Sequence, residues 1–250
     1  MPLPYYVSPE QMMKDKAEYA RKGIARGKAI VTLEYRDGVL LLAENPSTLL
    51  HKISEIYDRI AFAGVGKYNE FENLRVAGVR HADIKGYSYS RGDVTAKSLA
   101  NAYSQALGNI FTQDIKPFEV EVLVVEVGDN NGTKNEIYHI LYDGTIEDEK
   151  NYAAMGGQSD EIRRYLKDNY QEGLDFAGAV SAIAMLEDRS PAAHDLYQQF
   201  IQRLKMYWRV PLEIGVFFAV WFLAFNAKVS LRPIMSKLIM ARVVSRGRRG

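Results

Sequence analysis

The sequence predicts an α/β (α+β) fold, in which stacked β-sheets are flanked by layers of helices. The predicted elements follow the order helix, strands, two helices, strands, two helices. Turn signals join neighbouring strands into hairpins, and the later helices come in pairs. With 47% hydrophobic and 25% charged residues among 250, the composition is that of a globular protein large enough to bury a core. A disordered or collagen-like chain is therefore excluded.

The first predicted element is a helix that begins at Pro9 and ends near Gly23 or Gly27. Ser8 is the expected N-cap, and Pro9 suits the first helical position. Gln11 is expected to reach back to Ser8 in a capping box, because a Gln three residues after a capping Ser can satisfy its free backbone N–H.

Four strands are expected next, at residues 29–35, 39–43, 53–56 and 60–65. Asp37-Gly38 separates the first two and is a typical hairpin turn. Two helices follow. Tyr68, Phe71 and Leu74 share one helical face, and residues 94–111 carry an apolar stripe of helical period, for which Asp93 is the expected cap.

A second block of strands and helices is expected between residue 118 and residue 186. The predicted strands are residues 118–125, 137–142 and 152–155, with a turn at Asp143-Gly144 leading towards Ile146. The predicted helices are residues 159–170 and 174–186. In the first of these strands both alternating sets contain apolar residues, which indicates a strand buried on both faces.

Charge and cysteine content exclude several classes of function. There is no cysteine, which excludes disulfide scaffolds, thiol catalysis and cysteine-based zinc sites. No acid follows Glu213, whereas residues 228–250 hold seven Lys or Arg residues, so the body is mildly acidic and the tail is basic. We interpret the tail as a solvated arm and expect no binding of nucleic acid by the body.

No recognisable catalytic or metal-binding motif is present. The four histidines, His51, His81, His139 and His194, have no metal-ligand spacing, so we expect no metal and no cofactor. Residues 64–68 lack the Gly and the Ser or Thr that a phosphate-binding loop requires. Neither a nucleophile elbow nor a dinucleotide fingerprint occurs.

Ordered blocks over residues 1–188 nevertheless resemble a known family. They include Ser8-Pro9-Glu10-Gln11, Ala43-Glu44-Asn45-Pro46-Ser47, Lys52-Ile53-Ser54-Glu55-Ile56, Gly66-Lys67-Tyr68-Asn69-Glu70-Phe71, Tyr142-Asp143-Gly144 and Met155-Gly156-Gly157. In this order they resemble bacterial proteasome α subunits of the actinobacterial type. The resemblance implies a four-layer αββα sandwich of the N-terminal-nucleophile hydrolase type, with an N-terminal helix across the face of a ring.

The resemblance also implies that the catalytic site is absent. Catalytic members of this fold class use a processed N-terminal Thr, whose free amine acts as base and which nearby Asp and Lys side chains tune. When this sequence is aligned with that pattern, Lys28 falls near the position of the nucleophilic Thr. Glu44 falls near the position of the tuning Asp, and Glu55 near that of the tuning Lys. Lys28 has no hydroxyl, and Thr32 lies inside a predicted strand. We therefore expect a non-catalytic subunit of a threonine-type endopeptidase complex, with no catalytic residue.

The implied role is architectural and cytoplasmic. Identical α subunits would form a heptameric ring that templates and caps β rings, and a hexameric ring ATPase would feed in tagged protein substrates. Lys52 is expected in the pocket for the ATPase tails. The expected gate consists of Pro2, Leu3, Pro4, Tyr5, Tyr6 and Val7, and the expected channel entrance consists of Lys116, Pro117, Phe118 and Glu119.

The resemblance ends near residue 188, so we expect three parts: residues 1–27, 28–188 and 189–250. The last part contains a predicted helix at residues 192–208, an uncharged run at residues 214–227 and the basic tail. The run has three interpretations: a buried strand pair, a membrane-contacting segment or an altered terminus. Two other functions therefore remain open, a self-processed hydrolase and an assembly protein attached to a membrane through residues 210–233, although we expect no membrane partner.

Overall fold

The computed structural model describes residues 7–44, 50–128, 134–176, 178, 179 and 182, and the backbone of 239–245. The helices are α1 (Pro9–Ile24), α2 (Tyr68–Ser88), η1 (Arg91–Asp93), α3 (Ala96–Gln113) and α4 (Ser159–Asn169). The strands are β1 (Ile30–Tyr35), β2 (Gly38–Glu44), β3 (Ile53–Tyr57), β4 (Ile60–Gly66), β5 (Val120–Glu126), β6 (Glu136–Ile140), β7 (Ile146–Glu149), β8 (Tyr152–Met155) and β9 (Ile239–Ser245).

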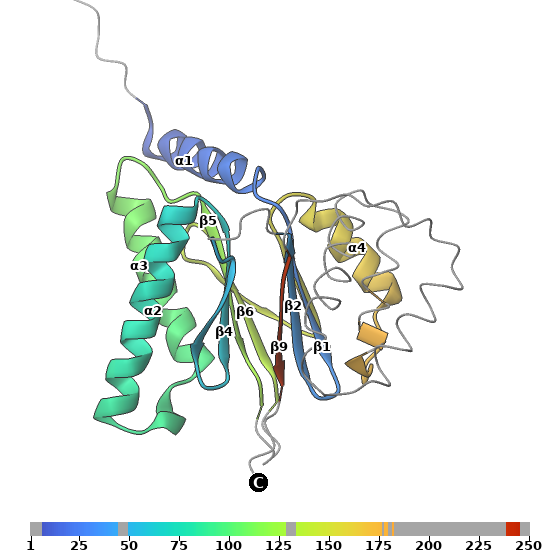
Figure 1. Ribbon diagram of the computed structural model, residues 1–250. Coiled ribbons are helices and arrows are strands. Elements are labelled where there is room, and N and C mark those ends of the chain that lie inside the picture. Colours follow the sequence, from blue (N-terminus) through green and yellow to red (C-terminus); the bar gives the residue numbers. More distant parts are fainter. Residues whose placement is uncertain are drawn as a thin grey trace, which may run out of the picture.

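Two sheets pack face to face between helices, which confirms the predicted sandwich (Figure 1). One sheet has the strand order β8-β1-β2-β9 and the other β3-β4-β5-β6-β7, and neighbours within each are antiparallel. The helices α2 and α3 cover the outer face of the five-stranded sheet, and α4 covers that of the four-stranded sheet. The first helix, α1, crosses one end of the sandwich.

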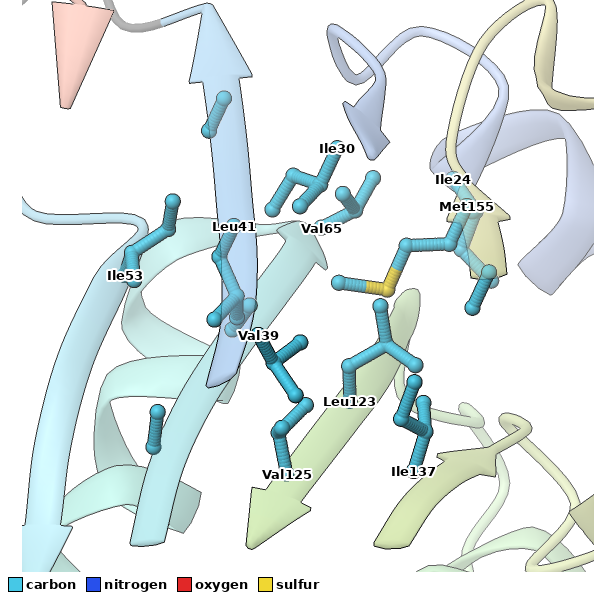
Figure 2. Packing of buried hydrophobic residues seen from close by; sticks show 14 of the residues in the cluster. Ile24, Ile30, Val39, Leu41, Ile53, Val65, Leu123, Val125, Ile137 and Met155 are labelled. Atoms are coloured by element: carbon cyan, nitrogen blue, oxygen red, sulfur yellow. The ribbon is translucent and has the colours of Figure 1, made fainter. Parts of the chain in front are cut away.

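Strands at the centre of the sandwich are buried on both faces because alternate side chains enter different cores. Val39 and Leu41 point into the space between the sheets, where they face Leu123 and Val125 (Figure 2). Leu40, on the other face of β2, packs in the cluster that includes α4 residues. Each such Val or Leu contributes about 1.5–3 kcal/mol by leaving water. This double burial explains the continuous apolar runs in the sequence.

The capping of α1 agrees with the prediction in part, and the capping of α3 does not. Ser8 does cap α1, since its Oγ accepts a hydrogen bond from the backbone N–H of Gln11 at 3.2 Å. The reciprocal half of the capping box was wrong, because the Gln11 side chain donates to Asp15 one turn ahead. For α3 the cap is Thr95 and not Asp93, which ends the short helix η1.

Two strands were not predicted. The first, β7, has an acid-rich sequence and pairs with β6 at the edge of the five-stranded sheet. The second, β9, lies in the basic tail and pairs antiparallel with β2 from Gly38 with Ser245 to Glu44 with Ile239. The solvated-arm interpretation was therefore wrong for residues 239–245. The predicted boundary at residue 188 divides residues that share one sheet.

Within predicted helix 174–186, the described residues Phe176, Gly178, Ala179 and Ala182 are helical, whereas Leu174 and Asp175, also described, are not. Residues 2–6 of the expected gate, the predicted helix at 192–208 and the uncharged run at 214–227 lie outside the described residues. None of the described helices combines the length and the apolar composition that crossing a bilayer requires.

Candidate functional site

Among the described residues, those predicted to be functional (Val7, Lys52 and residues 116–119) gather at the end of the sandwich that α1 crosses, which we call the α1 end. Here β1 begins, with Ile30 opposite Met155, and β4 ends, with Gly66 opposite Val120. The connection from α1 into β1 passes against the end of β8, where the N–H of Gly157 donates to the carbonyl oxygen of Gly27 at 2.8 Å. The helix, both sheets and their connections therefore meet in one place.

Lys52 lies at this end and its ammonium is bound to the chain just before β1. Its Nζ donates to the carbonyl oxygen of Lys28 at 3.0 Å, and the N–H of Gly64 donates to the carbonyl oxygen of Lys52. The resemblance had placed Glu55 near the position of the tuning lysine. The structure instead brings Lys52 to Lys28, whereas the Glu55 side chain is exposed in β3. The side chain of Glu44 lies outside the described part.

The hydroxyl nearest to Lys28 in the sequence is unsuited to attack a substrate. Thr32 has 0% exposure, and its Oγ1 has no hydrogen-bond partner among the described residues. It lies in the middle of β1, opposite Leu41 on one side and Ala153 on the other. Lys28 itself, where the resemblance places the nucleophile, carries no hydroxyl and so lacks the group with which a threonine nucleophile attacks.

Lys116 and Glu119, expected at a channel entrance, belong to a network of charges centred on Glu70. The Glu70 side chain is 8% exposed, and its Oε1 lies 2.9 Å from Lys116 Nζ and 3.6 Å from Lys67 Nζ. Its Oε2 accepts from the backbone N–H of Glu119 at 2.7 Å. Lys116 also pairs with the Glu119 carboxylate at 3.0 Å. Glu70 stands in the first turn of α2, at the positive end of the helix dipole.

The pKa values of two network members shift in the direction expected for an ion pair. Burial opposes the charged form of Lys116, but its hydrogen bonds to Glu70 and Glu119 outweigh that cost and raise the pKa of Lys116. Burial likewise opposes ionised Glu119, and the hydrogen bond from Lys116 outweighs it and lowers the pKa of Glu119. Both groups are therefore charged at neutral pH, and they hold the loop of residues 114–119 against α2.

The loop of residues 114–119 has an anchored part and an exposed part. Pro117 is buried, and Phe118 is half-buried against the core under α2 and α3. Ile115, which was not predicted, is 97% exposed and is the tip of the loop. Residues 117 and 118 thus fix the loop to the body, and Ile115 with Lys116 forms its outer surface. Single exposed apolar residues carry no sequence signal, so Ile115 could not have been found in advance.

Sequence reasoning also missed a cluster of charged side chains around the buried His139 in β6. Its Nε2 lies 3.3 Å from Glu121 and its Nδ1 lies 3.2 Å from Glu147. The guanidinium of Arg163 lies 3.1 Å from the same Nδ1 and pairs with Glu149 at 2.9 Å. His139, Glu147 and Glu149 have metal-ligating atoms within 4.8 Å of one another. Arg163 already supplies a cation to these groups, so they do not fit a resident metal.

Comparisons with known proteins agree with this architecture. The proteasome subunit family matches residues 24–187. The chain therefore belongs to the proteasome subunit family. It is similar to the proteasome α subunits of Thermomonospora curvata (59% identical over 182 residues, 73% of this chain and 79% of the relative) and Kineococcus radiotolerans (61% over 180 residues, 72% and 76%). The α subunit of a Nocardioides species is 53% identical over 212 residues, 82% of this chain and 83% of the relative. Within the family, it is thus a bacterial subunit of the α type.

Proposed function

We propose that this chain forms the non-catalytic α ring of a cytoplasmic proteasome core particle. Identical copies make the ring, β subunits stack on it, and tagged proteins enter through it after a hexameric ring ATPase unfolds them. The proposal that the subunit is non-catalytic rests on the residues at and just before the start of β1. Lys28 has no hydroxyl, and the nearby Thr32 hydroxyl is buried in the middle of the strand.

The α1 end is the surface that we assign to substrate entry and ATPase docking. Gate residues 2–7 directly precede α1, and Val7, the member that the structure describes, is exposed. Lys52 lies at the same end, with its ammonium oriented by the Lys28 carbonyl oxygen. A lysine ammonium suits the terminal carboxylate of a docking peptide. Binding there would favour the open arrangement of the gate by population shift.

The opposite end carries the surface that we assign to the β ring. The helix α2 runs from the α1 end to the far end of the sandwich, where it terminates (Figure 1). The C-terminal part of α2 and the residue after it expose large apolar side chains: Ile84 at 67%, Tyr87 at 94% and Tyr89 at 77%. Exposed aromatic residues of this kind typically mark a protein interface. We call Tyr87 and Tyr89 the aromatic tip.

Reconstitution with an actinobacterial proteasome β subunit tests the proposal. The mixture should give stacked rings in electron micrographs, and intact mass should show that this chain keeps the residues ahead of Lys28. A peptide epoxyketone, which reacts covalently with N-terminal Thr, should label the β subunit alone. The rival, a self-processed hydrolase, predicts a shortened chain that carries the label. Labelling of this chain in the absence of β would refute the proposal.

A further inference from the structure

A small hollow lies at the end of the sandwich opposite α1. The turn from β3 to β4 lines one side of it, η1 lines another, and Glu126 at the end of β5 completes it. Here β4 begins, with Ile60 opposite Glu126, whereas it ends with Gly66 at the α1 end. The volume of the hollow is about 100 Å³. Small-molecule sites usually measure roughly 300–1,000 Å³, so this hollow suits a single side chain from another protein.

Arg91, the first residue of η1, is held in place beside this hollow. Its Nη2 donates to Asp58 Oδ1 at 3.0 Å, and its Cζ lies 5.7 Å from the centroid of the Tyr57 ring. The ion pair and the cation–π contact together orient the guanidinium. A guanidinium carries five N–H donors, so Arg91 can hold Asp58 and still bind a second acceptor.

The charges around the hollow favour an anionic partner. Arg91 pairs with Asp58, and Arg59 pairs with Glu126 at 3.4 Å. The two arginine side chains are 72% and 39% exposed, and those of their acidic partners are 36% and 12% exposed. Glu126 also accepts a hydrogen bond from the backbone N–H of Ala96 at 2.7 Å. An approaching protein therefore meets the guanidinium of Arg91 before it meets either carboxylate.

The hollow and the aromatic tip belong to one fixed surface. Tyr89 is two residues ahead of Arg91, and between them Ser90 donates from its Oγ to Asp93 Oδ2 at 2.8 Å, across η1. The end of α2 packs directly on the hollow, because a Cβ added at Gly86 would overlap the Tyr57 hydroxyl. Arg and aromatic residues are the side chains most enriched at the centres of protein interfaces.

We propose that Arg91 selects the β partner of this subunit: its guanidinium binds the carboxylate of one Asp or Glu side chain that the β ring inserts at the hollow. The inference rests on the proposed stacking of β subunits at this end and deepens it by naming a charged contact. The guanidinium fork matches a carboxylate in geometry as well as in charge. The aromatic tip supplies apolar contact area, and Arg91 rejects β surfaces that present a cation there.

The test measures association with an actinobacterial proteasome β subunit by sedimentation velocity. Arg91→Ala should weaken association at least tenfold, because a carboxylate of the β ring would lose its partner. Arg91→Lys should weaken it less, since an ammonium keeps the charge without the fork, and Arg91→Glu should weaken it most. The control is Arg164→Glu, the same change at an exposed arginine of α4, which should leave association unchanged.

A reciprocal substitution identifies the partner residue. Each exposed Asp and Glu of the β subunit is changed in turn to Arg and mixed with the Arg91→Glu chain, and one of these variants should restore stacking. If none does, the carboxylate contact is refuted. If the unaltered chain stacks on β rings and Arg91→Glu stacks equally well, the inference fails and the proposed function stands.

Failure of the unaltered chain to bind β rings would instead overturn the proposed function. Thermal unfolding shows whether each variant is folded. Should Arg91→Glu not fold, Arg91→Lys decides, and association equal to that of the unaltered chain overturns the inference.

Discussion

The ammonium of Lys52 donates a hydrogen bond to the carbonyl oxygen of Lys28, which joins the residue before β3 to the chain two residues ahead of β1. If Lys52 also receives the terminal carboxylate of an ATPase tail, Lys52→Ala should leave ring assembly and basal peptide hydrolysis intact and abolish ATPase-stimulated proteolysis. Lys150→Ala, an exposed lysine in the turn between β7 and β8, is the matched control. Unchanged stimulation in the Lys52 variant would show that the tails bind elsewhere.

Thr32→Val should stabilise the protein. The hydroxyl of Thr32 is fully buried without a hydrogen-bond partner among the described residues, and Val has nearly the same shape. Removing an unsatisfied buried polar group should raise the free energy of unfolding by about 1 kcal/mol. Urea denaturation of the unassembled chain measures this, and a decrease would mean that the hydroxyl has a partner. Proteolysis by assembled particles should not change, because Thr32 takes no part in the chemistry.

Gly66→Ala should destabilise the α1 end. Gly66 has a φ of +109°, and an added Cβ would overlap the carbonyl oxygen of Glu119. Strain at such a position costs about 1–3 kcal/mol. Gly108→Ala is the control, because Gly108 lies within α3 and its Cβ would meet the Asp143 carbonyl oxygen at an ordinary 3.5 Å. Comparable stability of the two variants in urea would contradict the assignment of strain to Gly66.

Stability should fall steeply above about pH 10. Burial raises the pKa of Tyr103, and it raises the pKa values of Tyr138 and Tyr170 to about 12, helped by Glu136 and Glu34 respectively. Since these values exceed those of the unfolded chain, the stabilisation is complete below about pH 10 and is lost as the pH rises towards 12.

Tyr103→Phe tests this cause, because the Tyr103 hydroxyl has no hydrogen-bond partner among the described residues. The variant should be at least as stable as the parent at pH 8 and lose less stability by pH 11, as measured by urea unfolding. An identical pH profile in the two proteins would assign the alkaline loss to other groups.

Replacing the aromatic tip should prevent stacking on the β ring. Tyr87 and Tyr89 are exposed at the end of α2, so changing both to Ser should leave the fold and its thermal unfolding intact. Association with β rings should weaken by at least tenfold, because central aromatic residues carry most of the energy of an interface. Sedimentation velocity of the mixture measures this, with Lys167→Ser on α4 as the control. Normal double-ring particles from the Tyr variant would place the β contact elsewhere.

Local patterns predicted most of the described fold. The hairpin between β1 and β2 follows from Asp37-Gly38, and β8 was predicted with its exact bounds, since apolar alternation and turn residues act over a few positions. The predictions failed where two local partners compete. The Gln11 side chain donates its hydrogen bond to Asp15 and not to the backbone at the cap. The N-cap of α3 is Thr95 and not Asp93, which lies only two residues earlier.

The remaining differences come from contacts between residues far apart in the chain. The sequence of β7 is acid-rich, and its strand conformation depends on pairing with β6. In the site, a docking role was predicted for Lys52 and stays a prediction, whereas its hydrogen bond to the Lys28 carbonyl oxygen was not predicted. Lys16 looked like one of several surface lysines, because the carbonyl oxygens that it binds, those of Phe111 and Asp114, lie 95 and 98 residues later. Such contacts carry no periodic signal, so they become visible only when the chain is folded.

The pairing of β9 with β2 has a consequence for biosynthesis. Gly38 lies opposite Ser245, so a ribosome must add some two hundred residues after β2 before the partner strand exists. Throughout that interval the edge of β2 that later pairs with β9 presents backbone N–H and C=O groups without that partner strand. Two chains translated from the same messenger RNA could pair through this open edge of β2. The yield of native protein would then depend on a chaperone that covers the edge, or on the rate at which the ribosome synthesises the residues up to β9.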